Sequence, residues 1–264
     1  MRPWRCALGA LQRDVCRVGV YLGAVRKDHR PYWLKRATAA YNQLWAEHFL
    51  CPQFDAVGPG LRTTNPRYIE VQGCGVRIGR DVHMMATIDR PIRFTSFPQQ
   101  ERWGDIEIGD YTIVLPGVRL ASAISIRVGK NCMFANNAYV SDADWHDVYD
   151  RTEAPGAIGP VVLEDNVWIG DSVIVCKGVT IGENSVIGAG AVVSRDIPKN
   201  TIAVGNPAVP TKEIDPAKIR RLRADLFHGE ISYDQYIDNF ERWVLGPNRL
   251  STYLRARLWP TREL

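Results

Sequence analysis

The chain has 264 residues, of which 45% are apolar and 23% charged, and this ordinary composition excludes a disordered protein and a bundle of membrane helices. No apolar run reaches the ~20 residues that a membrane span needs, and the N-terminal region lacks a clean signal-peptide core. The formal net charge of +4 is modest, and no segment resembles a nucleic-acid-binding module. Six cysteines without CxxC spacing favour a reduced, cytoplasmic protein.

Two helices are predicted for the N-terminal part, residues 1–53. The first covers residues 8–25, and the second begins at Pro31. The second helix presents one apolar face formed by Leu34, Tyr41, Leu44, Trp45, His48 and Phe49. Residues 1–50 hold nine Lys/Arg against three Asp/Glu, a net charge of +6. We interpret this charge first as a solvated helical surface. A weak contact with the inner face of a membrane or with an anionic glycan is the alternative.

An aliphatic residue followed by glycine recurs through the middle of the chain, as in Ile78-Gly79, Ile108-Gly109 and Val128-Gly129. Two polar segments interrupt this recurrence, residues 95–105 and residues 141–160. Function concentrates in loops on a rigid scaffold, so both interruptions are candidate site loops.

A strict period of six residues follows the second interruption. Its apolar positions are Leu163, Ile169, Val175, Ile181, Ile187 and Val193. This period fits neither a helix, with a period near 3.6, nor an alternating strand, with a period of 2. It fits a chain that turns a corner every six residues and points one aliphatic side chain per side into a prism, the pattern of a parallel β-helix. Cys132 and Cys176 fall within the repeats, and we expect both to be buried as small apolar residues.

Helices are predicted again for the C-terminal part, residues 213–264. Asp215 and Pro216 have the character of an N-cap and a first helical residue. Ser232 and Gln235 fit a capping box before an apolar stripe that starts at Tyr233. Such stripes are more often packing surfaces than binding sites. The predicted organisation is therefore a helical extension (1–53), a β-helix (54–212) and a second helical extension (213–264).

The repeats resemble the left-handed β-helix, hexapeptide-repeat acyltransferases that use acyl-CoA. The resemblance covers roughly residues 69–212 and is most specific in NVWIGDSVIVCKGVTIGENSVIGAGAVVSRDIPKNTIAVGNPA, residues 166–208. It is nearest to the sugar and polysaccharide O-acetyltransferases, similar to maltose and galactoside acetyltransferases. It implies a mainly β protein, a left-handed coil, acetyl-CoA as acyl donor, a sugar or glycan acceptor and a homotrimer, with no metal and no nucleic acid.

The resemblance places a catalytic histidine in SDADWHDVYDR, residues 141–151, which makes His146 the candidate general base. A neutral imidazole with a pKa near ~6.5 can take a proton from an acceptor hydroxyl at pH 7. A carboxylate on its second nitrogen would fix the tautomer. Asp142, Asp144, Asp147, Asp150 and Glu153 are all near enough, with Asp144 preferred and Glu153 the runner-up. Asn136, Asn137 and Asp142 are candidate contacts to acceptor hydroxyls, although asparagine also serves as a turn residue in such coils.

The resemblance also places the acyl donor. Gly188, Ala189 and Gly190 match the small residues that admit the pantetheine arm, and Trp168 matches a tryptophan of the same groove. Ser194, Arg195 and Lys212 match contacts to the phosphate and adenine end, where cations form charge-assisted bonds.

Other functions remain open from sequence alone. Within the enzyme class, N-acetylation of an amino-sugar nucleotide is the alternative, and a non-catalytic β-helix assembly module is a further one. A zinc enzyme of the same fold would need three converging histidines, but the repeat region offers only His83 and His146.

Overall fold

Short parallel strands in three sheets form the larger of two units, Ala39–Tyr233. The computed structural model describes residues 28–99, 102–152, 154–229 and 231–259. Sheet A contains, in order, β1 (Ala56–Val57), β4 (Val76–Ile78), β9 (Asp105–Ile108), β12 (Ser125–Val128), β15 (Val161–Leu163) and β18 (Thr180–Ile181). Sheet B contains β2 (Arg62–Thr64), β5 (His83–Met85), β10 (Ile113–Val114), β13 (Met133–Phe134), β16 (Trp168–Ile169), β19 (Val186–Ile187), β21 (Thr201–Val204) and β22 (Val209–Glu213). Sheet C contains β20 (Val192–Val193), β17 (Ile174–Val175), β14 (Tyr139–Ser141), β11 (Arg119–Ser122), β6 (Ile92–Ser96) and β3 (Ile69–Gln72).

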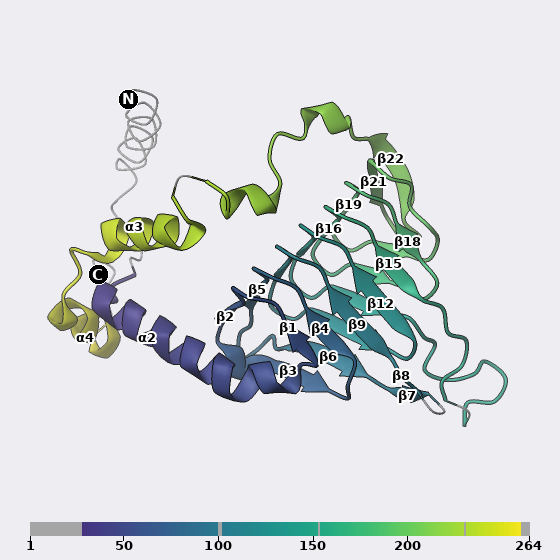
Figure 1. Cartoon of the computed structure of the whole chain (residues 1–264), viewed down its shortest axis with the longest axis horizontal. Helices are drawn as coiled ribbons and strands as arrows, with labels where there is room; N and C mark the ends of the chain where they lie inside the picture. Colours follow the sequence, from purple (N-terminus) through teal and green to yellow (C-terminus); the bar gives the residue numbers. More distant parts are fainter. Residues whose placement is uncertain (1–27, 100–101, 153, 230, 260–264) are drawn as a thin grey trace. The chain divides into compact units, whose positions relative to one another are not determined.

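The three sheets are the sides of a prism, and each coil adds one strand to each side (Figure 1). Leu163 pairs with Ile181, Ile169 with Ile187, and Val175 with Val193. Partners are thus eighteen residues apart, so three hexapeptides complete one coil. All six of these side chains are at most 1% exposed. Burying an aliphatic side chain contributes about 1.5–3 kcal/mol, so the repeated hexapeptide position supplies much of the stability of the prism.

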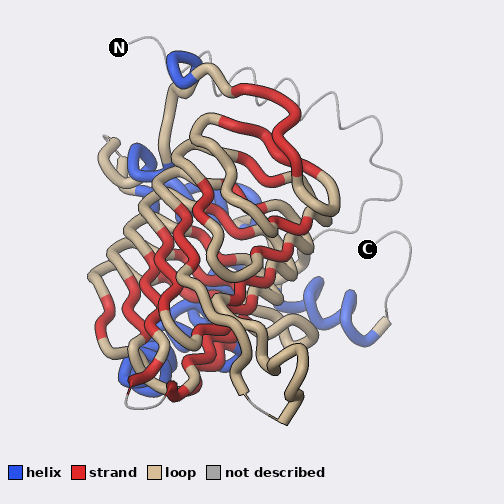
Figure 2. The backbone as a smooth tube through the Cα atoms, turned by 90° about the vertical axis from the view of Figure 1, so that its right-hand side faces the viewer, coloured by secondary structure: helices blue, strands red, loops and turns tan. Residues whose placement is uncertain are grey.

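This architecture confirms the predicted fold class, a left-handed parallel β-helix with helical extensions. Figure 2 shows the coils stacked on one another. Only two strand pairings are antiparallel in the part of the chain that the structure describes: β21 with β22, and the β7 (Pro98–Gln99)–β8 (Arg102–Trp103) hairpin. Both β7 and β8 lie within residues 95–105, the first predicted interruption of the repeats.

The corner between sheets A and B is built from residues with left-handed backbone conformation. Asn166, Asn184 and Asn200 have φ between 56° and 61°. Asparagine tolerates this region better than most residues because its short side chain bonds locally. The Asn166 side chain donates to Asn184, and Asn184 donates to Asn200, both at 2.9 Å. The ladder therefore stabilises the same turn in successive coils.

The cysteine predictions have different outcomes. Cys132 is buried in the prism, and this burial raises the pKa of its thiol to about 12. Cys176 lies at a corner after β17 and is only partly buried, so the prediction that it is buried is wrong. A residue at a corner is partly in contact with solvent even where the strand residue before it is buried.

A helical segment precedes the first coil. α2 (Tyr32–Trp45) continues as a π-helical turn, η2 (Ala46–Leu50), and a 3₁₀ turn, η3 (Cys51–Gln53). The helix predicted from Pro31 is confirmed, and of its predicted apolar face Trp45 packs against the core of the prism. Leu44 and Phe49 are exposed, whereas Ala46 and Leu50 are buried against the core of the prism. The π-helical turn shifts the helix periodicity and selects a different pair of residues for burial.

The chain returns along the corner between sheets A and B. The 3₁₀ turns η5 (Pro216–Lys218) and η6 (Arg223–Leu226) lie in this segment. A further 3₁₀ turn, η4 (Pro66–Tyr68), lies near the start of the prism, directly before β3. Asp215 accepts from the backbone of Ala217, which confirms it as an N-cap, although of a 3₁₀ turn. Arg223 Nε donates to the carbonyl of Tyr111 at 2.7 Å, and Ala224 N donates to Asn131 at 2.8 Å.

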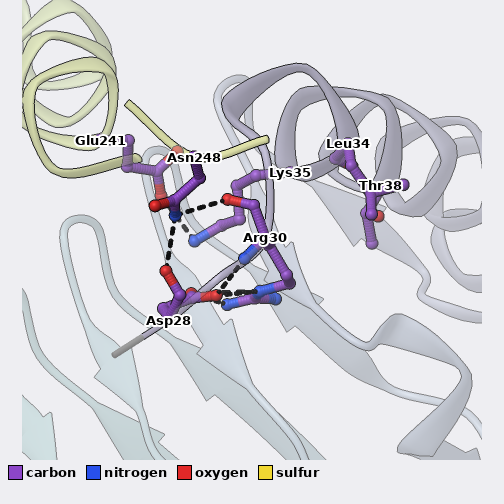
Figure 3. A network of polar contacts seen from close by, with 7 residues as sticks. All are labelled: Asp28, Arg30, Leu34, Lys35, Thr38, Glu241 and Asn248. Carbon is purple, nitrogen blue, oxygen red and sulfur yellow. Dashed lines mark hydrogen bonds and ion pairs between the residues drawn. The ribbon is translucent and has the colours of Figure 1, made fainter. Parts of the chain in front are cut away.

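The smaller unit contains residues 28–38 and 234–259 of the described chain. It includes most of α3 (Tyr233–Leu245), which confirms the predicted apolar helix, and α4 (Leu250–Leu258), which lies within the predicted C-terminal helical extension. Asn248 donates to the carbonyls of Asp28 and Arg30, and Lys35 pairs with Glu241 at 2.8 Å (Figure 3). The Arg30 guanidinium donates to the Asp28 carboxylate and lowers its pKa. Polar contacts thus join the two chain segments of this unit.

The predicted helix at residues 8–25 lies outside the described residues, as does most of the basic segment 1–50. The predicted boundaries after residues 53 and 212 stay predictions. None of the helices in the described ranges is long and apolar enough to cross a membrane.

Candidate functional site

The loop that carries His146 leaves the prism at the corner between sheets C and A. It starts after β14 and returns to β15, and its stem contains one isolated antiparallel bridge. Ala143 pairs with Ile158, Asp144 N donates to the Ala157 carbonyl at 2.8 Å, and Gly156 N donates to the Asp144 carbonyl at 2.7 Å. The stem fixes both ends of the loop, so its tip is held beside sheet C.

Asp142 lies at the base of this stem and is completely buried. Its carboxylate accepts four hydrogen bonds of 2.6–2.9 Å, from Ser122 Oγ and from the backbone N–H groups of Ala123, Ile124 and Ser125. These donors occupy both carboxylate oxygens. The prediction that Asp142 contacts acceptor hydroxyls is therefore corrected: Asp142 joins the loop to the turn between β11 and β12.

Asp144 has a different partner from the predicted one. Its carboxylate pairs with Lys177 Nζ at 2.7 Å, at the same corner one coil further along. Lys177 contacts one oxygen of this carboxylate, and the role of Asp144 in orienting His146 stays a prediction. Glu153, the other candidate, lies outside the described residues.

Two further acids order the tip of the loop. Asp147 Oδ1 accepts from the N–H groups of Asp150 and Tyr149, and these bonds lower the pKa of the Asp147 carboxyl. Asp150 in turn accepts from the backbone and hydroxyl of Thr152. Both acids act as turn residues, which is the local role that short acidic side chains commonly take.

His146 is exposed between these turns and the stem. Among the described residues, none forms a hydrogen bond with its imidazole ring. Its backbone is closely backed by Gly156: a Cβ on Gly156 would lie 2.5 Å from the His146 carbonyl oxygen. The imidazole is therefore open to a substrate. The main chain of His146 packs so closely against residue 156 that only glycine fits there.

Trp145, the residue before His146, turns towards the prism. Its Nε1 donates to Tyr139 Oη at 3.1 Å, and its ring centroid lies 4.4 Å from that of Phe97. Phe97 comes from the first interruption and Trp145 from the second, so the structure joins the two predicted site loops. Sequence reasoning singled out both loops but missed these aromatic residues, although Trp145 is adjacent to the candidate base.

Asn136 and Asn137 lie at the corner between sheets B and C. Asn137 has φ of 58°, and Ser172 N donates to the Asn136 carbonyl at 2.9 Å. Two coils further along, Gly190 N donates to the Asp171 carbonyl at 2.7 Å. The predicted acceptor asparagines and the predicted donor glycines thus form one column along this corner.

The three small residues of the predicted donor groove differ in their surroundings. A Cβ on Gly188 would lie 2.7 Å from Val204 Cγ1, so this glycine admits a neighbouring side chain. Ala189 and Gly190 are exposed, and no atom lies within 4 Å of a Cβ built on Gly190. Gly190 also has φ of 70°, a left-handed conformation that favours glycine. The open part of the groove is therefore Ala189-Gly190.

The other predicted donor contacts are accessible. Trp168 is 47% exposed on β16, and Lys212 is exposed on β22. Ser194 and Arg195 are exposed directly after β20, at the corner that also carries Lys177 and the stem of the His146 loop. The two corner columns border sheet C on either side, so most predicted site residues lie around this one side of the prism.

The described ranges contain no group of three or more His, Cys, Asp or Glu residues that could hold a metal ion. His83 lies on β5 in sheet B, whereas His146 lies on the loop after sheet C.

The family model "Bacterial transferase hexapeptide (six repeats)" matches residues 160–195. Residues 160–195 are therefore similar to bacterial transferase hexapeptide repeats. This match confirms the predicted resemblance to hexapeptide-repeat transferases in the segment that showed the strict six-residue period.

Similar proteins include two named galactoside O-acetyltransferases. The chain is 40% identical to the one from Escherichia coli over 93 residues, covering 34% of this chain and 45% of that protein. It is 38% identical to the one from Lactococcus lactis over 121 residues, covering 45% and 56%. The solved structure of galactoside acetyltransferase in complex with coenzyme A is 23% identical, with a TM-score of 0.45 and coverage of 72% and 86%. The chain spans about half the length of the curated relatives it matches.

Proposed function

We propose that this protein transfers the acetyl group of acetyl-CoA to a hydroxyl group of a sugar or glycan precursor. The exposed His146 on an ordered loop beside sheet C is the observation that carries the proposal. The hexapeptide repeats and the galactoside O-acetyltransferase activity named for two relatives support it.

In the proposed reaction, the His146 imidazole takes the proton of the acceptor hydroxyl as its oxygen attacks the thioester carbonyl carbon. Collapse of the tetrahedral intermediate breaks the carbon–sulfur bond and releases the CoA thiolate. The imidazolium returns its proton to this thiolate, so the products are an acetyl ester and CoA-SH. A histidine imidazole suits both steps because its ring nitrogen can accept a proton and then donate it again.

We place acetyl-CoA against the C-terminal coils of the prism, around the corner between sheets B and C. The open surface at Ala189-Gly190 supports a place for the pantetheine arm, and exposed Trp168 lies on the coil before it. Arg195 and Lys212 supply cations for the phosphates, with Ser194 as an additional donor. One chain forms only one wall of such a groove, so we propose that a homotrimer completes it.

We propose that an acidic residue of the same loop orients the His146 imidazole. Asp144 and Glu153 are the two acids preferred from sequence, and Asp144 also pairs with Lys177. A cytoplasmic location is likewise kept as a prediction.

Replacement of His146 tests the proposed base. His146→Ala should lower kcat by about 10²–10⁴, the usual range for a positioned general base, while calorimetry shows unchanged acetyl-CoA affinity. His228→Ala is the matched control, because His228 bonds to Tyr111 at the corner opposite sheet C and should keep its activity. Retention of about a third of wild-type turnover by His146→Ala would overturn the assignment.

The acceptor panel in this assay should contain neutral sugars, anionic sugars and amino sugars. An ester product is labile to hydroxylamine, whereas an amide product is not. A hydroxylamine-stable product from an amino sugar would establish the N-acetyltransferase alternative in place of O-acetylation.

A further inference from the structure

A row of paired positions on the outer face of sheet C has a distinctive charge pattern. The register aligns Glu70 with Arg93, Arg93 with Arg119, Arg119 with Tyr139, and Tyr139 with Ile174. Arg93 Nε donates to Glu70 at 2.7 Å, so the charges of this pair cancel. Within the described ranges, no carboxylate pairs with Arg119, which is exposed. The row therefore presents one uncompensated cation.

The Arg119 guanidinium is held in place by an aromatic ring. Its central carbon lies 4.6 Å from the centroid of Tyr139. A guanidinium stacked on an aromatic face keeps its edge N–H groups free to donate in the plane of the group. Stacking thus positions the cation without using the groups that would bind an anion.

Aromatic side chains continue from Tyr139 around a pocket of about 250 Å³. Its lining includes Arg93, Arg119, Phe97, Tyr139 and Trp145. Phe97 and Trp145 pack on each other, and Trp145 donates to Tyr139. The volume lies below the roughly 300–1,000 Å³ of pockets for drug-sized ligands, which suits one sugar ring better than a long chain. We call this space the sheet C pocket.

The chemistry of the sheet C pocket is specific in two ways. Aromatic faces pack against the C–H faces of a sugar ring, because both surfaces are apolar. A guanidinium binds a carboxylate or a phosphate through two parallel N–H bonds, which are stronger than bonds to neutral groups. A ligand that satisfies both parts is a saccharide with an anionic substituent.

We propose that the sheet C pocket is the acceptor site for an anionic saccharide, with Arg119 binding a carboxylate or phosphate of the ring that stacks on Phe97 and Trp145. This inference rests on the proposed function only in taking the bound saccharide as the acetyl acceptor. The pocket itself is defined by the contacts described above. Trp145, which lines the pocket, directly precedes the proposed base His146 in the chain, so the pocket and the base share one loop.

Direct binding tests the proposal independently of catalysis. Saturation-transfer NMR on the full chain would compare glucose, glucuronate and glucose 6-phosphate at one ionic strength. Wild type should bind at least one of the anionic sugars about tenfold or more tightly than glucose, since a charge-assisted bidentate pair is strong. The two anionic probes distinguish a carboxylate from a phosphate.

Variants assign the binding to the pocket. Arg119→Gln should abolish the preference for the anionic sugar and leave glucose binding unchanged. Phe97→Ala should weaken all three sugars together. Arg127→Gln is the matched control, because Arg127 is an exposed arginine on β12 in sheet A. It should bind as wild type does.

Three results would overturn the proposal: equal affinity of wild type for glucose and both anions, identical effects of Arg119→Gln and Arg127→Gln, or no binding of any of these sugars. In each case, acetyl transfer that depends on His146 would still be measurable with other acceptors. Failure of the pocket and failure of the proposed function are thus separate outcomes.

Discussion

Gly156 is the residue on which the position of His146 depends most directly. It lies in the stem of the loop, and its missing side chain leaves room for the His146 backbone. A methyl group there would displace the carbonyl of His146 or widen the stem, because a 2.5 Å contact between heavy atoms is not tolerated.

We expect Gly156→Ala to lower kcat by roughly ten- to a hundredfold, the effect of misplacing a catalytic group by about an ångström. Acetyl-CoA affinity should stay unchanged, because the donor contacts are on other coils. Gly229→Ala is the matched control, since the nearest neighbour of its Cβ, an oxygen of Ile231, would be 3.6 Å away. Full activity of Gly156→Ala would show that the main chain at His146 does not need this support.

Individual side-chain partners were the least predictable features of the site. The histidine itself is identifiable from the sequence because it lies in the second interruption of a regular repeat. The role of Asp144 depends on Lys177, which is 33 residues away in sequence, and that of Asp142 depends on the backbone of residues 122–125. Neither partner can be located until the number of residues in each coil is known.

Among elements, the turn between β11 and β12 is tied to the loop after β14 by Asp142. This carboxylate receives four hydrogen bonds within the buried interior, three of them from consecutive backbone N–H groups. The same residue therefore stabilises two adjacent coils and the stem that carries the proposed base.

We expect Asp142→Ala to lower the free energy of unfolding by about 3 kcal/mol, because several buried donors lose their acceptor at once. Urea denaturation would measure the change. Asp150→Ala should cost much less, since Asp150 is exposed and bonds Thr152 within its own loop. Equal losses for the two variants would contradict the structural role assigned to Asp142.

The hexapeptide period predicted the strands of the prism well, because every sixth side chain must point into the interior. The period carries no information on where interruptions meet. Phe97 and Trp145 come from different loops, and their contact follows from the stacking of β6, β11 and β14. The π-helical turn at Ala46–Leu50 was similarly hidden, since its burial depends on the first coil of the prism.

At the scale of the whole molecule, the described coils leave several large apolar side chains exposed on the sides of the prism. Trp168 is 47% exposed and Ile174 is 40% exposed, on adjacent strands of one coil. Trp168 is on sheet B and Ile174 is on sheet C, so they flank the corner between these sheets, and an interface at this corner would bury both side chains. A closed ring of three copies would cover them and would give each Ala189-Gly190 surface a facing wall.

Sedimentation should therefore give a mass of three chains for the wild type.

The Ala189→Trp variant tests where the acyl donor lies. An indole at this exposed corner would fill the space proposed for the pantetheine arm. Calorimetry should therefore show acetyl-CoA affinity reduced by at least about a hundredfold, because direct steric overlap removes most of the contacts. The trimer should persist, because Ala189 lines the groove without carrying the contact between subunits. The opposite pattern, a monomeric variant with intact donor binding, would place Ala189 in the interface. A fully active wild-type monomer would show that one chain holds the entire site.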